Sequence, residues 1–317
     1  MRFETPVPFE VFMAWALHDP QHGYYARQIS RVGRGGDFTT APMVSPAPAR
    51  ALAAWAIQAA RETGCWDLIE VGPGEGTLAA DILKFLPWHL RWKFHLHLVE
   101  TSAPLAARQK TLLGERATWY PQVGAALAAC RGRALIYSNE LVDAFPVRKY
   151  QKTSLGWQEV AISFDPSGQA HQSLIPLTSL PDSSGFSKTF TLGQCIEVHQ
   201  SYQRHLATWL PQWKTGRMLT IDYGNTVENL YHRRPQGTLR AYLFQQRLEG
   251  MAIYENPGRQ DLTADVNFTD LQNWSAPWCQ TLRLCPFSEF LKLPAEHPFS
   301  APHGAGAAFL VLEQGPL

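Results

Sequence analysis

Residues 67–77, DLIEVGPGEGT, carry the strongest indication of the fold class of this 317-residue chain. Its first five residues form a short apolar strand, and Gly72, Gly74 and Gly76 follow at alternate positions, before a predicted helix over residues 78–86. Glycine tolerates positive φ angles and lets a ligand approach the backbone closely. The unpaired N–H groups and the positive dipole end of a new helix favour anions. The stretch therefore predicts a strand–turn–helix unit with a ligand at its turn.

Strands and helices alternate on both sides of this turn. We expect an alanine-rich helix over residues 45–63, strands over 94–99, near 119–121 and over 134–137, and a helix over 102–113. Such alternation is typical of a mostly parallel sheet that is covered on both faces. The predicted fold class is α/β, with a Rossmann-like sheet and helices on both of its faces.

The chain is expected to have four segments. They are an N-terminal helical cap and basic loop (1–63), the cofactor-binding Rossmann half (64–146), an inserted β excursion (147–190) and the remainder of the core (191–317). The cap contains an amphipathic helix over 5–18, and the basic loop spans 27–36. The last segment should contain a helix over 195–213, strands over 218–224 and 307–313, and a long loop insertion at 225–267. Long irregular segments usually cover active sites or contact partners.

Composition restricts the function classes. The 28 basic and 27 acidic residues nearly cancel, which gives no reason to expect a nucleic-acid partner. No stretch is apolar enough to span a membrane, and residues at the start of the sequence lack the pattern of a secretory signal, so we do not expect one. The five cysteines are scattered, which favours a reducing compartment, and the eleven histidines show no metal-ligand spacing. We expect a cytoplasmic protein without a metal, while the low charged fraction of 17% slightly favours a protein partner.

An acid completes the predicted cofactor site. Glu100 ends the second strand, 28 positions after Gly72, where a carboxylate can accept hydrogen bonds from both ribose hydroxyls of an adenosine. The spacing G-x-G-x-G differs from the dinucleotide pattern G-x-G-x-x-G. Glu70 precedes the turn, where it could bind water or the amino group of a cofactor, or form a salt bridge at the end of the strand. A negative charge there would have no use beside the pyrophosphate of NAD. These features favour S-adenosylmethionine (SAM) over NAD.

Eight segments form an ordered series along almost the whole chain. They are FMAWALHDPQHGYY (12–25), GDFTTAPMVSP (36–46), IEVGPGEGTLAADIL (69–83), VETSAPLAARQ (99–109), SNELVDAFPV (138–147), IDYG (221–224), GTLRAY (237–242) and PGRQDLTADVNF (257–268). This series resembles the MidA family of SAM-dependent methyltransferases, whose mitochondrial members are complex I assembly factors that methylate arginine. The resemblance implies a class I methyltransferase fold with an N-terminal helical cap.

The resemblance also implies site residues. SAM would be held by the glycine turn and Glu100, and Asn139 and Glu140 would face the methyl group. The complete set of predicted cofactor residues is Glu70, Gly72, Pro73, Gly74, Glu75, Gly76, Thr77, Glu100, Thr101 and Asn139. The chain departs from the family at Asp265, where a histidine is usual, and near Gln245 and Gln246, where a family histidine is absent. These departures leave SAM binding intact and put the substrate in doubt.

Carboxylates beyond the fourth strand are the candidate catalytic groups. A guanidinium has a pKa above ~12, so carboxylates are needed to orient it and to take up its proton. Glu140 and Asp143 lie three positions apart, so a short turn can present both to one pocket, although either could instead cap the next helix. Asp222, at the tip of the fifth strand, either lines the acceptor side or caps a turn.

Three functions remain open on the sequence. The first is methylation of arginine on a protein partner, which predicts a wide, acidic cleft. The second is a small-molecule O- or N-methyltransferase with a closed apolar pocket. The third is a non-catalytic assembly factor that binds SAM without turnover. The acceptor, the degree of methylation and the oligomeric state are not determined by the sequence.

Overall fold

The structure is a computed structural model that describes residues 3–27, 45–293 and 308–317. Residues 28–36 of the expected basic loop and residues 36–44 of the GDFTTAPMVSP segment lie outside the described residues.

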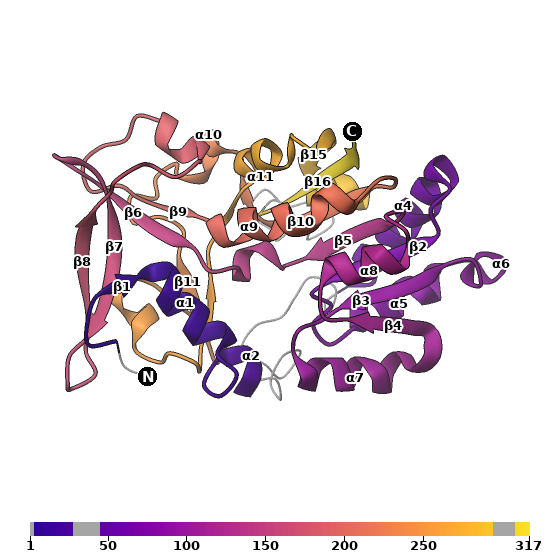
Figure 1. Cartoon of the computed structure of the whole chain (residues 1–317), viewed down its shortest axis with the longest axis horizontal. Coiled ribbons are helices and arrows are strands. Elements are labelled where there is room, and N and C mark those ends of the chain that lie inside the picture. Colours follow the sequence, from indigo (N-terminus) through magenta and orange to yellow (C-terminus); the bar gives the residue numbers. More distant parts are fainter. Residues whose placement is uncertain (1–2, 28–44, 294–307) are drawn as a thin grey trace.

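A central sheet of eight strands carries the fold (Figure 1). Its order is β15-β16-β10-β5-β2-β3-β4, with β14 paired to β10. The strands are β2 (Asp67–Val71), β3 (His95–Val99), β4 (Ala117–Tyr120), β5 (Leu135–Asn139), β10 (Met218–Asn225), β14 (Val266–Asn267), β15 (Cys279–Pro286) and β16 (Phe309–Pro316). All pairs are parallel except those of β16 with β10 and with β15, which are antiparallel. The predicted mostly parallel sheet is confirmed.

Helices cover both faces of this sheet. On β2, the side chain of Leu68 packs into one hydrophobic cluster and that of Ile69 into another, as the two-residue period of a strand requires. The first cluster includes α4 (Ala47–Thr63), α5 (Thr77–Phe85), the end of α7 (Ala103–Leu113) and α12 (Phe287–Leu291). The second includes α8 (Val123–Ala129), α9 (Gln200–Trp209) and α11 (Phe268–Ser275). The Rossmann-like α/β architecture is therefore confirmed.

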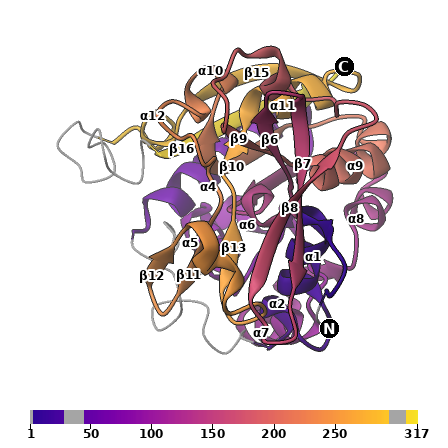
Figure 2. The ribbon, with the colours of Figure 1, turned by 90° about the vertical axis from the view of Figure 1, so that its left-hand side faces the viewer.

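A second, antiparallel sheet lies beside the core (Figure 2). It contains β1 (Val7–Pro8), β6 (Arg148–Thr153), β7 (Gly156–Phe164), β8 (Ala170–Pro176) and β9 (Cys195–Val198). The apolar face of α1 (Phe9–His18) packs against it, since Phe12 and Ile162 share one cluster. Helix α2 (Tyr24–Arg27) follows α1, and the two together form the N-terminal cap.

Two expected elements differ in the structure. Residues 195–198 of the predicted helix over 195–213 are strand β9, and α9 begins only at Gln200. All four residues of β9 are buried, and a short, fully buried run has no period that separates a strand from a helix. Helix α9 continues into a 3-10 turn over Leu210–Gln212.

The expected loop insertion at 225–267 contains regular structure. Strands β11 (Arg240–Leu243), β12 (Gln246–Leu248) and β13 (Asp261–Thr263) form a small antiparallel sheet, accompanied by α10 (Val227–Leu230) and a 3-10 turn over Gly250–Tyr254. These strands have only three or four residues and include several charged side chains, so they show little hydrophobic alternation. The expected last strand, β16, lies between β10 and β15 and pairs antiparallel with both.

Candidate active site

A cleft of about 820 Å3 lies at the carboxyl ends of the parallel strands. Open α/β sheets bind their ligands at this edge. The cleft is lined by the turn between β2 and α5, the end of β3, the start of α8 and the end of β5. The predicted residues that line it are Glu70, Gly72, Pro73, Gly74, Glu75, Thr77, Glu100, Thr101, Asn139 and Glu140.

The glycine turn has the backbone that its sequence predicts. The φ angles of Gly72, Gly74 and Gly76 are 67°, 55° and 77°, in the left-handed region that favours glycine. A Cβ on Gly72 would lie 2.5 Å from Cδ1 of Leu141, so the turn packs directly on the residues after β5. A Cβ on Gly74 would meet no atom of the described residues within 4 Å. The turn thus packs against the residues after β5 at Gly72 and leaves open space on the cleft side of Gly74.

A buried glutamine connects the turn to the acid of β3. Gln109 of α7 is 0% exposed, and its Nε2 donates to the carbonyl oxygen of Gly74 at 2.7 Å and to Oε2 of Glu100 at 3.1 Å. Its Oε1 accepts from Nε1 of Trp119 at 2.9 Å, and the backbone N–H of Ser102 donates to Oε1 of Glu100 at 2.7 Å. One side chain therefore fixes the distance between the two halves of the predicted cofactor site.

Sequence reasoning did not identify Gln109. The signal was present, because Leu105, Gln109 and Leu113 are spaced by four residues and are the buried residues of α7. A polar residue within such an apolar stripe requires internal partners.

Glu70 is a buried carboxyl group at the cleft. It is 2% exposed, and its Oε2 has no hydrogen-bond partner among the described residues. Burial raises the pKa of Glu70 to about 8; the neighbouring Tyr137 hydroxyl offsets part of the rise, and the charge of Glu100 adds to it. Burial also raises the pKa of Glu100. An orphaned carboxyl oxygen at a cleft suits a cationic amino group of a ligand. Glu75, by contrast, is already paired with Arg108, at 2.7 Å between Oε1 and Nη1.

Glu140 occupies the cleft at the tip of β5. Its φ angle is 53°, an uncommon conformation for a residue other than glycine, which costs roughly 1–2 kcal/mol. Its backbone N–H donates to the carbonyl oxygen of Ile221 at 2.9 Å, and Nδ2 of Asn139 donates to its Oε1 at 3.1 Å. Strained backbone is often found at functional sites.

Asp222 and Asp143 lie behind Glu140. Asp222 is fully buried, and its Oδ2 accepts the backbone N–H groups of Leu141, Val142 and Asp143 at 3.1, 2.8 and 3.3 Å. Burial, with the charges of Asp143 and Glu140, raises the pKa of Asp222 well above its usual range. Oδ2 of Asp143 accepts a hydrogen bond at 2.7 Å from Oγ1 of Thr263, which lies on β13 of the small sheet. Of the three predicted catalytic acids, only Glu140 is among the described residues that line the cleft.

The far wall of the cleft is largely aromatic. It is lined by Tyr25 of the cap, by Phe145, which follows the turn after β5, and by His205 of α9. The rings of Phe145 and His205 are 5.2 Å apart, and burial lowers the pKa of His205 to about 4, so this imidazole is neutral at pH 7. The hydroxyl of Tyr25 donates to Oδ1 of Asp261 at 3.1 Å, which ties the cap to the small sheet.

The departures from the family pattern lie away from the cleft lining of the described chain. Asp265 forms ion pairs with Arg240 and Arg234. Gln245 has a φ angle of 65° in the turn between β11 and β12, and Gln246 is exposed at the start of β12.

Comparisons with known proteins show what this chain is similar to. A family model described as "Putative S-adenosyl-L-methionine-dependent methyltransferase" matches residues 51–284. The chain is 28% identical to the mitochondrial protein arginine methyltransferase NDUFAF7 of Danio rerio over 90% of its length and 72% of that protein. It is 29% identical to the Drosophila melanogaster homologue over 83% of its length and 65% of that protein, so it spans about two thirds of these relatives.

A solved structure from Burkholderia thailandensis has the same fold and contains S-adenosyl-homocysteine. Its TM-score is 0.81 at 26% identity, over 98% of this chain and 88% of that one. The match supports SAM as the cofactor, and the cleft fits it: open space adjoins Gly74, and the orphaned oxygen of Glu70 and the carboxylate of Glu100 lie in one cleft.

The relatives correct one expectation. They are named as mitochondrial proteins, which contradicts the predicted cytoplasmic location. The prediction was wrong because scattered cysteines indicate a reducing compartment without identifying which one. Within the part of the chain that the structure describes, every helix is too short or too polar to cross a membrane.

Proposed function

Since this chain belongs to the MidA family of SAM-dependent methyltransferases, we propose that its methyl acceptor is the guanidinium group of an arginine on a protein partner. The proposal is supported by the names of the relatives, which are protein arginine methyltransferases, and by the position of Glu140 in the cleft. A fold alone does not fix a substrate, so the acceptor has to be argued from the site.

The residues at the β2 edge would hold the cofactor. SAM, when bound, supplies an electrophilic methyl group on its sulfonium. Glu100 would accept hydrogen bonds from the ribose hydroxyls, and Glu70 would accept them from the amino group. The turn from Gly72 to Gly76 and the first N–H groups of α5 would receive the carboxylate, since a helix N-terminus favours an anion. Thr77, Thr101 and Asn139 line the same cleft and complete the set.

Glu140 would bind and orient the acceptor. A carboxylate can engage a guanidinium through two parallel N–H donors, which fixes one nitrogen in line for attack. The guanidinium loses one proton when its nitrogen gains the methyl group, and the Glu140 carboxylate would accept that proton. The rings of Phe145 and Tyr25 would exclude water and offer faces on which a guanidinium can stack.

Asp143 and Asp222 would act at a distance from the acceptor. The three N–H groups that Asp222 accepts belong to the residues that follow Glu140, so Asp222 is a positioning residue for that turn. Asp143 connects the same turn to the small sheet through Thr263. Neither is required to touch the substrate in this proposal.

Transfer of labelled methyl groups tests the proposal. The protein is incubated with labelled SAM and a lysate, and the labelled species are separated into proteins and small molecules, with methylarginine identified after hydrolysis of the proteins. We expect label in methylarginine with the parent protein and with the surface control Glu115→Gln, and little with Glu140→Gln. Label on small metabolites alone would assign the aromatic cleft to a small-molecule acceptor instead. SAM binding without any label would indicate a non-catalytic assembly factor.

A further inference from the structure

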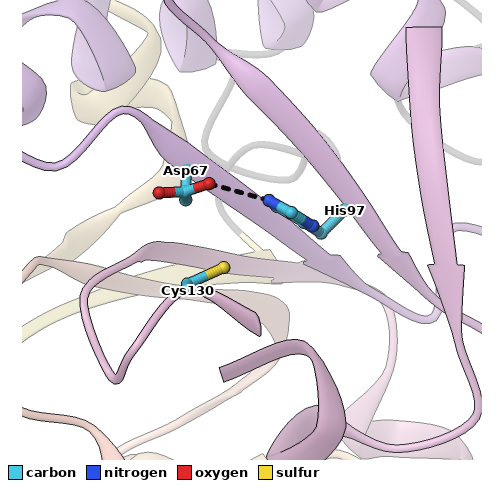
Figure 3. Close-up of side chains that lie close together, drawn as sticks. All are labelled: Asp67, His97 and Cys130. Carbon is cyan, nitrogen blue, oxygen red and sulfur yellow. Dashed lines mark hydrogen bonds and ion pairs between the residues drawn. The ribbon is translucent and has the colours of Figure 1, made fainter. Parts of the chain in front are cut away.

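Three metal-binding side chains converge on the α8 face of the sheet (Figure 3). Asp67 begins β2, His97 lies on β3, and Cys130 caps the end of α8. Oδ1 of Asp67 is 2.9 Å from Nε2 of His97, and one ligand atom from each of the three residues lies within 4.8 Å of the other two. Asp67 and Gly72 are five positions apart on an extended strand, or about 16 Å, so this cluster is separate from the cofactor turn.

We propose that Asp67, His97 and Cys130 form a binding site for Zn²⁺, or for a transition metal of similar preference, with one coordination position left to water. Tetrahedral zinc with bonds of ~2.0–2.3 Å needs ligand atoms roughly 3.3–3.6 Å apart. The separations in the cluster, from 2.9 Å to at most 4.8 Å, lie on both sides of that value, so small side-chain rotations satisfy it.

The ligand set selects the metal. A thiolate and an imidazole favour zinc, cobalt or a similar ion, whereas Mg²⁺ and Ca²⁺ prefer sites made only of oxygen atoms. Sequence spacing could not reveal this set, because 30 and 33 positions separate its members along the chain (67 to 97 and 97 to 130). The parallel neighbours β2 and β3, and helix α8, which follows β4, bring the three together.

Burial makes the cluster a site with one open side. His97 and Cys130 are 8% and 7% exposed, while the side chain of Asp67 is 31% exposed and provides access from solvent. A divalent ion binds a cysteine side chain as the thiolate, so binding at this site releases a proton.

The surroundings limit the affinity. Nδ1 of His97 has no hydrogen-bond partner in the described part of the chain. Metal-binding histidines usually donate from their second nitrogen, and loss of such a partner costs about 10–100-fold in affinity. We therefore expect weaker binding than at a four-ligand structural zinc site. The bound ion would pin the end of α8 to β2 and β3, and the start of α8 lines the cofactor cleft through Val123 and Gly124.

Titration with Co²⁺ tests the site. The full chain is treated with a chelator, dialysed, and titrated with Co²⁺ while the thiolate-to-cobalt charge-transfer absorption is recorded. We expect one equivalent of Co²⁺ to bind, Zn²⁺ to displace it, and Mg²⁺ in large excess to leave it unchanged. The absorption should be lost in Cys130→Ser and retained in Cys279→Ser, since Cys279 is a second buried cysteine outside the cluster.

A second ligand variant and the release of protons test the same metal site independently of Cys130→Ser. Asp67→Asn changes the most exposed of the three ligands, so this variant should fold, and we expect its affinity for Co²⁺ to fall at least ten-fold. Zn²⁺ added to the parent protein in weak buffer should release about one proton per ion bound. Absence of charge-transfer absorption in the parent protein, or equal absorption in folded Cys130→Ser, overturns the proposal. SAM binding is measured separately and is not required for either outcome.

Discussion

Replacement of Gln109 by methionine should weaken SAM binding without abolishing the fold. Methionine conserves the volume of the side chain, which matters because Cγ of Gln109 would lie only 3.1 Å from a Cβ on Gly76. The variant loses the two donated hydrogen bonds to Gly74 and Glu100 and the bond accepted from Trp119. In the variant, no side chain at position 109 connects the glycine turn to Glu100 by hydrogen bonds.

The size of the effect follows from these three bonds. Each intramolecular hydrogen bond contributes about 1 kcal/mol, and one to a charged group about 1.5–3 kcal/mol. The total loss of about 3–5 kcal/mol divides between folding and ligand binding, because the glycine turn can relax in the free protein. We expect the free energy of unfolding to fall by about 2 kcal/mol and the Kd for SAM to rise about 10–100-fold.

Titration calorimetry measures the Kd for SAM, and unfolding in urea measures the free energy of unfolding. Gln58→Met is the matched control, since Gln58 is exposed on α4 and its side chain bonds to Glu62 on the same helix. This control should match the parent protein in both assays. A folded Gln109→Met variant that binds SAM with the parent Kd would refute the role given to Gln109.

Three other substitutions probe the acids of the site. Glu140→Gln should lower the methylation rate about 10²–10⁴-fold, while the Kd for SAM stays within about two-fold of that of the parent protein. A variant that methylates as fast as the parent protein in a radiolabel assay would remove Glu140 from the mechanism. Asp222→Ala leaves two buried N–H groups and one part-buried N–H group without their acceptor, and it should lower the free energy of unfolding by at least about 3 kcal/mol in urea. A loss below about 1 kcal/mol would contradict the positioning role of Asp222. Glu70 has a folded-state pKa of about 8 against an ordinary value of 4.5, so the folded state binds the extra proton and stability declines as pH rises through this window. Unfolding measured from pH 5 to 8.5 should show that decline, by as much as a few kcal/mol, and Glu70→Gln should flatten it; a decline of equal size in Glu70→Gln would assign it to other groups.

The core of the fold was predictable because its signals are local. Residues 67–71 form a strand at the predicted position, and Glu100 follows β3 at the cleft as expected. Both depend on an apolar run with a clear end and on residues adjacent to it. The small sheet of β11, β12 and β13 was missed because its strands are short and carry charged side chains, one of which, Arg240, is paired with Asp265 only in the folded protein.

The side-chain directions at the site were not predictable. Asp143 follows Glu140 by three positions, but its carboxylate bonds to Thr263, which is 120 positions away. Asp222 satisfies the backbone of a turn 79–81 positions earlier. The metal cluster has the same origin, since its three ligands meet only after strands and helices have packed. Spacing in the sequence gives proximity along the chain, whereas these contacts are set by tertiary packing.

A crystal structure of the chain with S-adenosyl-homocysteine would show where the cofactor binds. We expect both ribose hydroxyls to donate to the carboxylate of Glu100, and the amino acid end of the ligand to lie against the turn at Gly72–Gly76 beside Glu70. An adenosine bound elsewhere, or one whose ribose lies beyond hydrogen-bond distance of Glu100, would contradict this expectation.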